Sequence, residues 1–205
     1  MSTWAIVVAA GSGTRFGERK QYLRLSGARV LDWALREPLT WCDGVVLVVP
    51  PDVVDDEEPE VTAVVAGGAT RSESVRNGLA VVPADVDVVV VHDAARPVPV
   101  PGVWERVLAA VDAGADAAVP AIPLTDSLRR IDGPAVDRSG IVSVQTPQGF
   151  RAAALRAAHA TGADATDDAS LVEAAGGRVV LVEGDPANLK ITTPVDLSFA
   201  ELLCR

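Results

Sequence analysis

A glycine-rich segment close to the amino terminus has the composition of a phosphate-binding loop. It runs from Gly11 to Gly17 with the sequence GSGTRFG. Because glycine lacks a side chain, the backbone N–H groups of such a loop can approach and cradle a polyphosphate. Arg15 within the segment and Lys20 after it supply positive charge to balance phosphate oxygens. We therefore expect a local anion site on a chain whose net charge is −10.

Three classes of glycine-rich loop bind phosphates, and the sequence distinguishes between them. A Walker A loop ends in Gly-Lys-Ser/Thr, which this segment lacks. A dinucleotide-binding loop carries its third glycine where Phe16 stands. The third class is the Gly-x-Gly-Thr-Arg turn of nucleotidyltransferases, and Arg15 and Lys20 match its phosphate-facing cations. One alternative stays open, because the basic residues between 15 and 24 also suit a solvated helix face.

Two further polar loops follow predicted strands. Gly67–Ser74 comes after the apolar run Val61–Val65, and His92–Pro97 comes after Val86–Val91. In an open α/β sheet, ligands bind beyond the carboxyl ends of the strands, so these loops and the glycine loop should meet in one cleft. A carboxylate at a strand end is a typical Mg²⁺ ligand beside phosphates, which makes Asp93 the candidate metal ligand. Its alternative role is to cap the next turn.

The elements that must position these loops alternate along the chain. Apolar runs without polar alternation predict strands buried on both faces of a parallel sheet. They occur at Ala5–Ala10, Val45–Val49, Val61–Val65, Val86–Val91, Ala117–Ala121 and Val179–Val182. Helices are expected near Val30–Thr40, Ser72–Val82, Pro101–Ala113, Arg151–Ala160, Asp167–Ala175 and Pro194–Leu203. This order predicts a single α/β domain over residues 1–205 with a doubly wound, mostly parallel, Rossmann-like sheet.

One stretch, from Pro123 to Gln148, interrupts this alternation. It has no helical period, and Asp132-Gly133-Pro134 is typical of a turn between two extended arms. We expect a β-hairpin that projects from the core. The alternative is a long surface loop, although ordered loops of this length are uncommon unless they are functional.

Composition excludes several other classes of protein. A hydrophobic fraction of 49% with 22% charged residues is typical of a globular chain. The negative net charge argues against a general affinity for nucleic acid. No run approaches the ~20 apolar residues of a membrane span. The two cysteines, Cys42 and Cys204, and the two histidines, His92 and His159, do not form a disulfide framework or a histidine metal centre, which favours a cytoplasmic protein.

Lysine is rare in the chain. There are sixteen arginines and only two lysines, Lys20 and Lys190. A composition that replaces lysine by arginine wherever a charge suffices should retain lysine where a compact ammonium is needed. Both lysines are therefore candidates for a specific role.

Together these loops resemble the 2-C-methyl-D-erythritol 4-phosphate cytidylyltransferase family of the non-mevalonate isoprenoid pathway. The matching segments span almost the whole chain and occur in the family's order. They are Ala9–Phe16, Lys20–Tyr22, Gly67-Gly68, Arg71–Val75, Val91–Pro97, Thr146–Gln148, Thr166–Ser170 and Asn188–Thr192.

The resemblance implies a role for individual residues. Arg15 and Lys20 would stabilise the transition state at the CTP phosphates. The nucleotide would be bound by Ala9, Ala10, Gly11, Gly13, Gly68, Ser74, Asp93, Ala94 and Lys190. The sugar-alcohol phosphate would contact Asp93, Arg96, Ser127, Arg138, Thr166 and Lys190. Asp93 would hold Mg²⁺ or another divalent cation, and the arm over residues 123–148 would be exchanged across a homodimer, so that Ser127 and Arg138 reach the partner's substrate.

The sequence departs from the family pattern at two positions and leaves two other functions open. Ala69 stands where some members carry an aspartate, and Ser127 replaces the threonine of the arm. A related enzyme, ribitol-5-phosphate cytidylyltransferase, shares most phosphate contacts, but the pair Ala94-Ala95 favours the erythritol enzyme. A non-catalytic nucleotide-binding domain is the other alternative, and it would not need Arg15, Lys20, Asp93 and Lys190 together.

Overall fold

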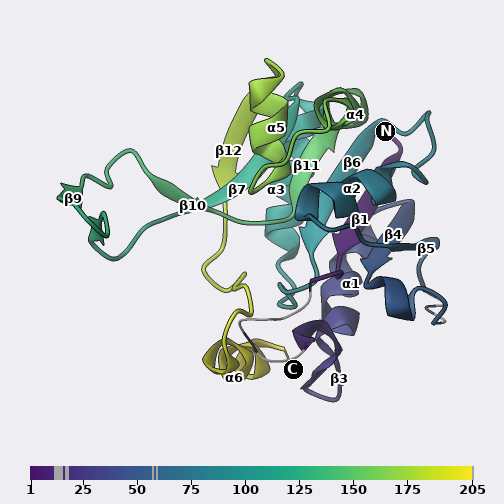
Figure 1. Ribbon diagram of the computed structural model, residues 1–205, viewed down its shortest axis with the longest axis horizontal. Helices are drawn as coiled ribbons and strands as arrows, with labels where there is room; N and C mark the ends of the chain where they lie inside the picture. The colour runs from purple at the N-terminus through teal and green to yellow at the C-terminus, as the bar shows by residue number, and fades with distance from the viewer. Residues whose placement is uncertain (12–15, 17–18, 57, 59, 205) are drawn as a thin grey trace.

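The computed structural model describes residues 1–11, 16, 19–56, 58 and 60–204 (Figure 1). In this part of the chain an eight-stranded sheet runs in the order β10-β7-β11-β6-β1-β4-β5, with β12 paired to β7. Its strands are β1 (Thr3–Val8), β4 (Gly44–Val49), β5 (Ala63–Ala66), β6 (Val88–Asp93), β7 (Ala117–Pro123), β10 (Val142–Val144), β11 (Gln148–Arg151) and β12 (Val179–Glu183). Two short antiparallel pairs lie outside it: β2 (Arg24–Leu25) with β3 (Ala28–Arg29), and β8 (Leu128–Arg129) with β9 (Ala135–Val136).

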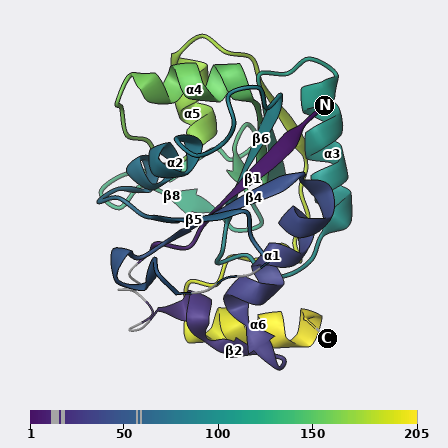
Figure 2. The same ribbon diagram turned by 90° about the vertical axis from the view of Figure 1, so that its right-hand side faces the viewer.

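Helices cover both faces of the sheet. They are α1 (Val30–Trp41), α2 (Arg71–Leu79), α3 (Pro101–Asp112), α4 (Ala152–Ala160), α5 (Asp168–Ala174) and α6 (Pro194–Leu203), with the 3₁₀ turns η1 (Lys20–Tyr22) and η2 (Pro51–Val53). Figure 2 shows α2, α4 and α5 on one side of the strands and α1 and α3 on the other. Strands β1, β4, β5 and β6 are mutually parallel, which confirms the doubly wound α/β fold. None of the described helices has the length and apolar character needed to cross a membrane.

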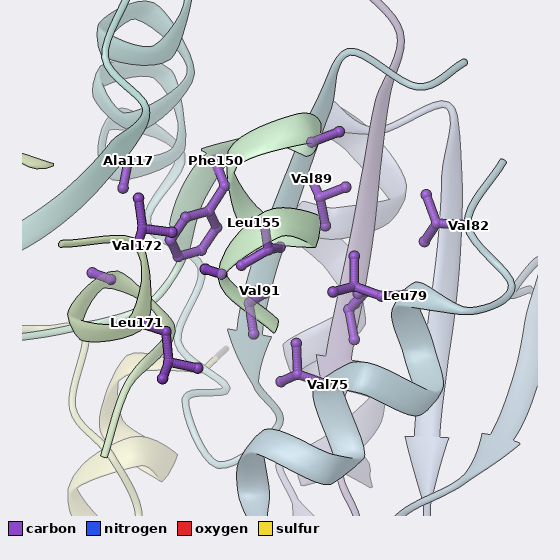
Figure 3. Close-up of a cluster of buried hydrophobic side chains, with 14 of the residues drawn as sticks. Val75, Leu79, Val82, Val89, Val91, Ala117, Phe150, Leu155, Leu171 and Val172 are labelled. Carbon is purple, nitrogen blue, oxygen red and sulfur yellow. The ribbon is translucent and has the colours of Figure 1, made fainter. Parts of the chain in front are cut away.

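Alternation along the strands divides the core into two layers. In β6, Val89 and Val91 pack with α2, α4 and α5, whereas Val88 and Val90 pack with α3 on the opposite face. Figure 3 shows the first layer, where side chains from α2 and α4 meet Val89, Val91 and Phe150. Every residue of β4 and β6 is buried, because both faces of the sheet are covered. This burial on both faces explains why the sequences of these strands are continuous runs rich in valine.

Three predicted strands were displaced by one or two residues, and the helix that was predicted to end at Val82 ends at Leu79. The first strand ends at Val8, so Ala9 and Ala10 lie in the loop beyond it. The predicted strand Val86–Val91 instead runs from Val88 to Asp93, because its ladder with β1 continues to the pair Val8↔Asp93. The predicted strand Val61–Val65 runs from Ala63 to Ala66. Strand β11, which the sequence did not reveal, lies antiparallel between β6 and β7.

The segment after β7 leaves the body of the protein as an arm (Figure 1). Strand β10 returns along β7 at its base, and β8 pairs with β9 farther out, on either side of Asp132-Gly133-Pro134. Ile131 near the tip is 99% exposed. The Ile131 side chain thus has almost no contact with the rest of this chain.

Candidate functional site

A pocket of about 480 Å³ opens beyond the carboxyl ends of β1 and β6. From β1 the chain adds β4 and then β5 on one side, and it then returns to place β6 on the other side of β1. Open α/β sheets bind ligands at the point where the order of strands changes direction in this way. The pocket is lined by Val8, Ala9, Ala10, Gly11, Phe16, Lys20, Gln21, Gly68, Ala69, Thr70, Arg71, Ser74, Asp93, Ala94, Ala95, Lys190 and Thr192. The three loops that the sequence singled out therefore meet at one place.

Asp93 enters this pocket from the last position of β6. Its Cα is paired with Val8, the last residue of β1, and the next backbone N–H, of Ala94, donates to the Val8 carbonyl at 3.1 Å. The Asp93 N–H donates to Oγ1 of Thr146 at 3.0 Å. These bonds hold the Asp93 backbone at the start of the glycine loop.

Lys190 forms an ion pair with Asp93. Its Nζ lies 2.5 Å from Oδ2 of Asp93, although 97 positions separate the two residues. The segment that carries Lys190 is held against the loop after β6 by two bonds. The Ile191 N–H donates to the Ala95 carbonyl at 2.8 Å, and the Arg96 guanidinium donates to the Asn188 carbonyl at 2.6 Å.

Lys20, the second lysine of the chain, lines the same pocket. Its Nζ donates to the carbonyl oxygen of Ile191, the residue after Lys190, at 2.5 Å. The neighbouring Gln21 is buried, and its amide donates to the carbonyl oxygens of Ala9 at 2.7 Å and Gly11 at 3.2 Å. Gln21 therefore anchors the first residues of the glycine loop.

The Gly67–Ser74 loop approaches the glycine loop closely. A Cβ at Gly67 would lie 2.2 Å from Cβ of Ala10, so only glycine permits this contact. The Gly68 N–H donates to Oγ of Ser74 at 3.1 Å, and Ser74 in turn donates to the Thr70 carbonyl at 3.0 Å. Thr70 caps α2 by accepting from the Glu73 N–H at 3.1 Å. The start of α2 is thereby fixed beside the pocket.

Charges around Asp93 keep its carboxyl ionised. Burial by itself would raise the pKa of Asp93, but the positive charges of Lys190, Arg71 and Arg96 outweigh it and lower the pKa well below its usual range. Burial also opposes the charge of Arg71, and the carboxylates of Asp168 and Asp93 outweigh it and raise the Arg71 pKa. The pocket therefore contains one anionic carboxylate among several cations.

His92, directly before Asp93, is buried and contacts the loop that follows β6. It is 3% exposed, and its ring lies 5.5 Å from that of Trp104. Nε2 of His92 lies 3.2 Å from the Arg96 carbonyl, which can only accept, so Nε2 carries the proton and donates. Nδ1 of the neutral ring then accepts from the Thr146 hydroxyl at 3.2 Å, while Thr146 Oγ1 accepts from the Asp93 N–H. Burial lowers the pKa of His92 to about 4, so the ring is neutral at physiological pH.

Nine of the predicted site residues line the pocket: Ala9, Ala10, Gly11, Lys20, Gly68, Ser74, Asp93, Ala94 and Lys190. Arg15 and Gly13 lie outside the described residues. The remaining four are not among the lining residues. Arg96 holds the segment that carries Lys190, Thr166 is exposed just before α5, and Ser127 and Arg138 are exposed on the arm, where the Arg138 guanidinium donates to the Leu124 carbonyl.

Several residues that line the pocket were not predicted as site residues, among them the polar side chains of Gln21, Arg71 and Thr192. All three stand inside the segments that resemble the family, but no local pattern separates a glutamine that binds backbone from one on the surface. Thr192 carries no charge to mark it. Its hydroxyl donates to Asp196 at 2.7 Å, which ties the pocket wall to the first turn of α6.

Comparison with known proteins agrees with this geometry. The sequence model of the 2-C-methyl-D-erythritol 4-phosphate cytidylyltransferase (IspD) family matches residues 3–205 of this chain. The chain belongs to this family. The resemblance noted in the sequence is thereby confirmed.

Several relatives are similar over nearly the whole chain. The 2-C-methyl-D-erythritol 4-phosphate cytidylyltransferase of Nocardia farcinica is 41% identical, over 98% of this chain and 94% of the relative. The bifunctional enzyme IspD/IspF of Nitratidesulfovibrio vulgaris is 42% identical over 98% of this chain, but the chain spans only 58% of that relative. Among solved structures, the family member from Thermus thermophilus superposes with a TM-score of 0.86 at 37% identity, covering 98% of each chain.

Proposed function

We propose that the protein transfers a cytidylyl group from CTP to 2-C-methyl-D-erythritol 4-phosphate, giving 4-diphosphocytidyl-2-C-methyl-D-erythritol and pyrophosphate in isoprenoid precursor biosynthesis. The observation that carries this proposal is the meeting of Lys20, Lys190 and Asp93 in one pocket of a chain that belongs to this family. Both lysines of an arginine-rich protein line that pocket. Such a concentration of ammonium groups suits a polyphosphate.

The reaction needs no nucleophile from the protein. An oxygen of the substrate's own phosphate attacks the α-phosphorus of CTP and forms a new P–O bond. The bond between the α-phosphorus and the bridging oxygen breaks, and pyrophosphate leaves with the electron pair. The attacking phosphate is already anionic near neutral pH, so no general base is required.

The protein's contribution is therefore positioning and neutralisation of charge. Lys20 and Lys190 come from opposite ends of the sequence, and they are linked because Nζ of Lys20 donates to the carbonyl oxygen of Ile191, the residue that follows Lys190. Ammonium groups fixed before the reaction stabilise the charge that develops on the phosphoryl oxygens without reorganising. Arg15 remains a predicted partner in this role.

Asp93 fits a single-carboxylate site for Mg²⁺. Its Oδ2 accepts from Lys190, whereas Oδ1 lies 3.5 Å from Nε of Arg71 and faces no closer cation in the described part of the chain. No group of three or more His, Cys, Asp or Glu side chains gathers there either. Mg²⁺ characteristically uses one or two carboxylates together with substrate phosphates. When bound, the ion would neutralise phosphate charge.

The arm belongs to the same proposal. Ser127 and Arg138 are exposed on it and do not line this chain's pocket, while Ile131, Ile141, Val142 and Val144 are exposed apolar residues of the same segment. An arm that reached across a homodimer would cover this apolar surface and bring Arg138 to the partner's substrate. The exchanged-arm homodimer and a cytoplasmic location both stay predictions.

Pyrophosphate release tests the proposed function directly. We expect release with CTP and 2-C-methyl-D-erythritol 4-phosphate, and much less when ribitol 5-phosphate replaces the acceptor. ATP or GTP should support little turnover, because the Gly67–Ser74 loop resembles the loop that forms a small pyrimidine pocket in this family. Equal rates with purine triphosphates would contradict the choice of CTP. CTP binding without release with either acceptor would instead support the non-catalytic alternative.

A further inference from the structure

Arg71 lies between two carboxylates and is hydrogen-bonded to one of them. Its Nη1 donates to Oδ2 of Asp168 at 2.7 Å. Its Nε lies 3.5 Å from Oδ1 of Asp93, which is longer than an ordinary hydrogen bond. The guanidinium lines the pocket and is thus held toward Asp168, away from direct contact with Asp93.

Asp168 is fully buried behind the pocket, in the first turn of α5. Its second oxygen, Oδ1, lies 3.0 Å from Nε2 of His159, a buried residue near the end of α4. Among the described residues Nδ1 of His159 has no hydrogen-bond partner. A buried N–H without an acceptor is costly, so the proton belongs on Nε2, which donates to Asp168. His159 therefore fixes the orientation of the Asp168 carboxylate.

The two carboxylates compete for one guanidinium. A charge-assisted bond of 2.7 Å is much stronger than a contact at 3.5 Å, so Asp168 determines where Arg71 lies. If Asp168 lost its charge, Asp93 would be the remaining anion beside Arg71. Arg71 would then close onto Oδ1 while Lys190 occupies Oδ2. Both oxygens of Asp93 would be blocked.

We infer that Asp168, oriented by His159, is a positioning residue that holds Arg71 off Asp93 and so keeps Oδ1 of Asp93 open to the divalent cation that accompanies the nucleotide. The inference rests on the proposed function, because it assumes that a metal–nucleotide complex binds in this pocket. It adds two buried side chains, neither of which lines the pocket, to the determinants of metal binding.

Calorimetric titration with CTP, without the acceptor substrate, measures the effect in the absence of turnover. Each protein is titrated once with Mg²⁺ and once with EDTA. The Kd in EDTA divided by the Kd in Mg²⁺ is the metal ratio, and it gives the contribution of the metal to CTP binding. Asp168→Asn should reduce that ratio by about tenfold, since changes to residues that orient a metal ligand typically cost roughly 10–100-fold in affinity. Arg71→Gln should not lower the ratio, since it removes a cation 3.5 Å from Oδ1 of Asp93, and the double variant Asp168→Asn, Arg71→Gln should restore it.

Restoration in the double variant is the decisive outcome, because a merely structural role for Asp168 predicts no recovery when Arg71 is removed. Arg76→Gln is the matched control. This arginine lies on the same helix and pairs with Asp164 at 3.3 Å without lining the pocket, so its loss should change nothing. If Arg71→Gln itself lowers the ratio, or if the double variant stays as weak as Asp168→Asn, the inference is overturned.

A second route covers the case in which Asp168→Asn does not fold. His159→Leu removes the donor that orients Asp168, and it should lower the metal ratio in the same direction, again with recovery on Arg71→Gln. An unchanged ratio in folded His159→Leu would count against the inference. Wild-type protein that binds CTP equally with Mg²⁺ and EDTA would overturn both the metal site and the inference, whereas a metal effect in wild type that Asp168→Asn leaves intact overturns the inference alone.

Discussion

Nζ of Lys190 lies 2.5 Å from Oδ2 of Asp93, and it joins the segment before α6 to the end of the central strand β6. The Asp93 side chain is 11% exposed and that of Lys190 is 39% exposed, so the carboxylate is buried while the ammonium reaches the pocket. This pair both balances a buried charge and presents a cation to the ligand.

Replacement of Lys190 should therefore affect both activity and stability. Lys190→Gln should lower kcat/KM by roughly 10²-fold, as loss of a preorganised charge does in other enzymes. It should also lower the free energy of unfolding by about 1–3 kcal/mol, because Asp93 loses its shortest hydrogen bond. Urea unfolding and pyrophosphate release measure the two effects. In Lys190→Arg the charge is kept, so stability should largely return, and wild-type stability in Lys190→Gln would refute the dual role.

Lys20 should act mainly on the reaction. Lys20→Ala should lower kcat by roughly 10²-fold. Lys20→Arg should stay impaired, because the planar guanidinium is larger than the ammonium that donates to Ile191. Arg24→Ala provides a control, since Arg24 donates to the Gly27 carbonyl, is exposed and lies outside the pocket. Steady-state kinetics that show near-wild-type kcat for either Lys20 variant would remove it from the catalytic machinery.

His92 should make stability depend on pH. Its pKa is about 4 in the folded protein, against an ordinary value of about 6.5 in the unfolded chain. Between these values the unfolded state binds the extra proton, so stability is fully present above about pH 6.5 and is lost as the pH falls toward 4. The total loss from this residue is of the order of 3 kcal/mol.

Thermal unfolding between about pH 4 and 7, in EDTA to exclude metal, measures this dependence. The comparison is His92→Gln, which cannot titrate and retains an N–H donor for the Arg96 carbonyl. The variant should show a shallower slope over this range, the remaining slope coming from other groups. Parallel pH profiles for the two proteins would mean that His92 is not buried neutral.

The arm can be tested by mixing two inactive variants. Arg15→Ala and Arg138→Ala should each be poorly active as homodimers if every site takes Arg15 from one chain and Arg138 from the other. Unfolding and refolding them together makes about half of the dimers mixed, and each mixed dimer has one intact site, so activity should return to about a quarter of wild type. Mixing that recovers no more than the average of the two variants would show that the arm serves its own chain.

Much of this protein was predictable from local patterns in the sequence. The valine runs predicted the buried strands because a strand covered on both faces must be apolar at every position, as β4 and β6 are buried throughout. The glycine loop and Asp93 were predicted to meet because both follow parallel strands, and parallel strands end at the same edge of a sheet. These inferences needed only short-range periodicity and a rule of topology.

The pairing of side chains, in contrast, was decided by the tertiary structure. Nothing within a few residues of Lys190 indicates that its partner is Asp93, and nothing near Arg71 indicates that Asp168 holds it, since 97 positions separate each pair. Strand β11 was missed because it is short and follows the arm, and its place between β6 and β7 depends on both. Such contacts arise when the order of strands brings distant loops together, and burial then fixes which charges face each other. The sequence by itself determined which loops meet at the pocket, whereas only the folded chain decided which of their charges pair and which remain open to a ligand.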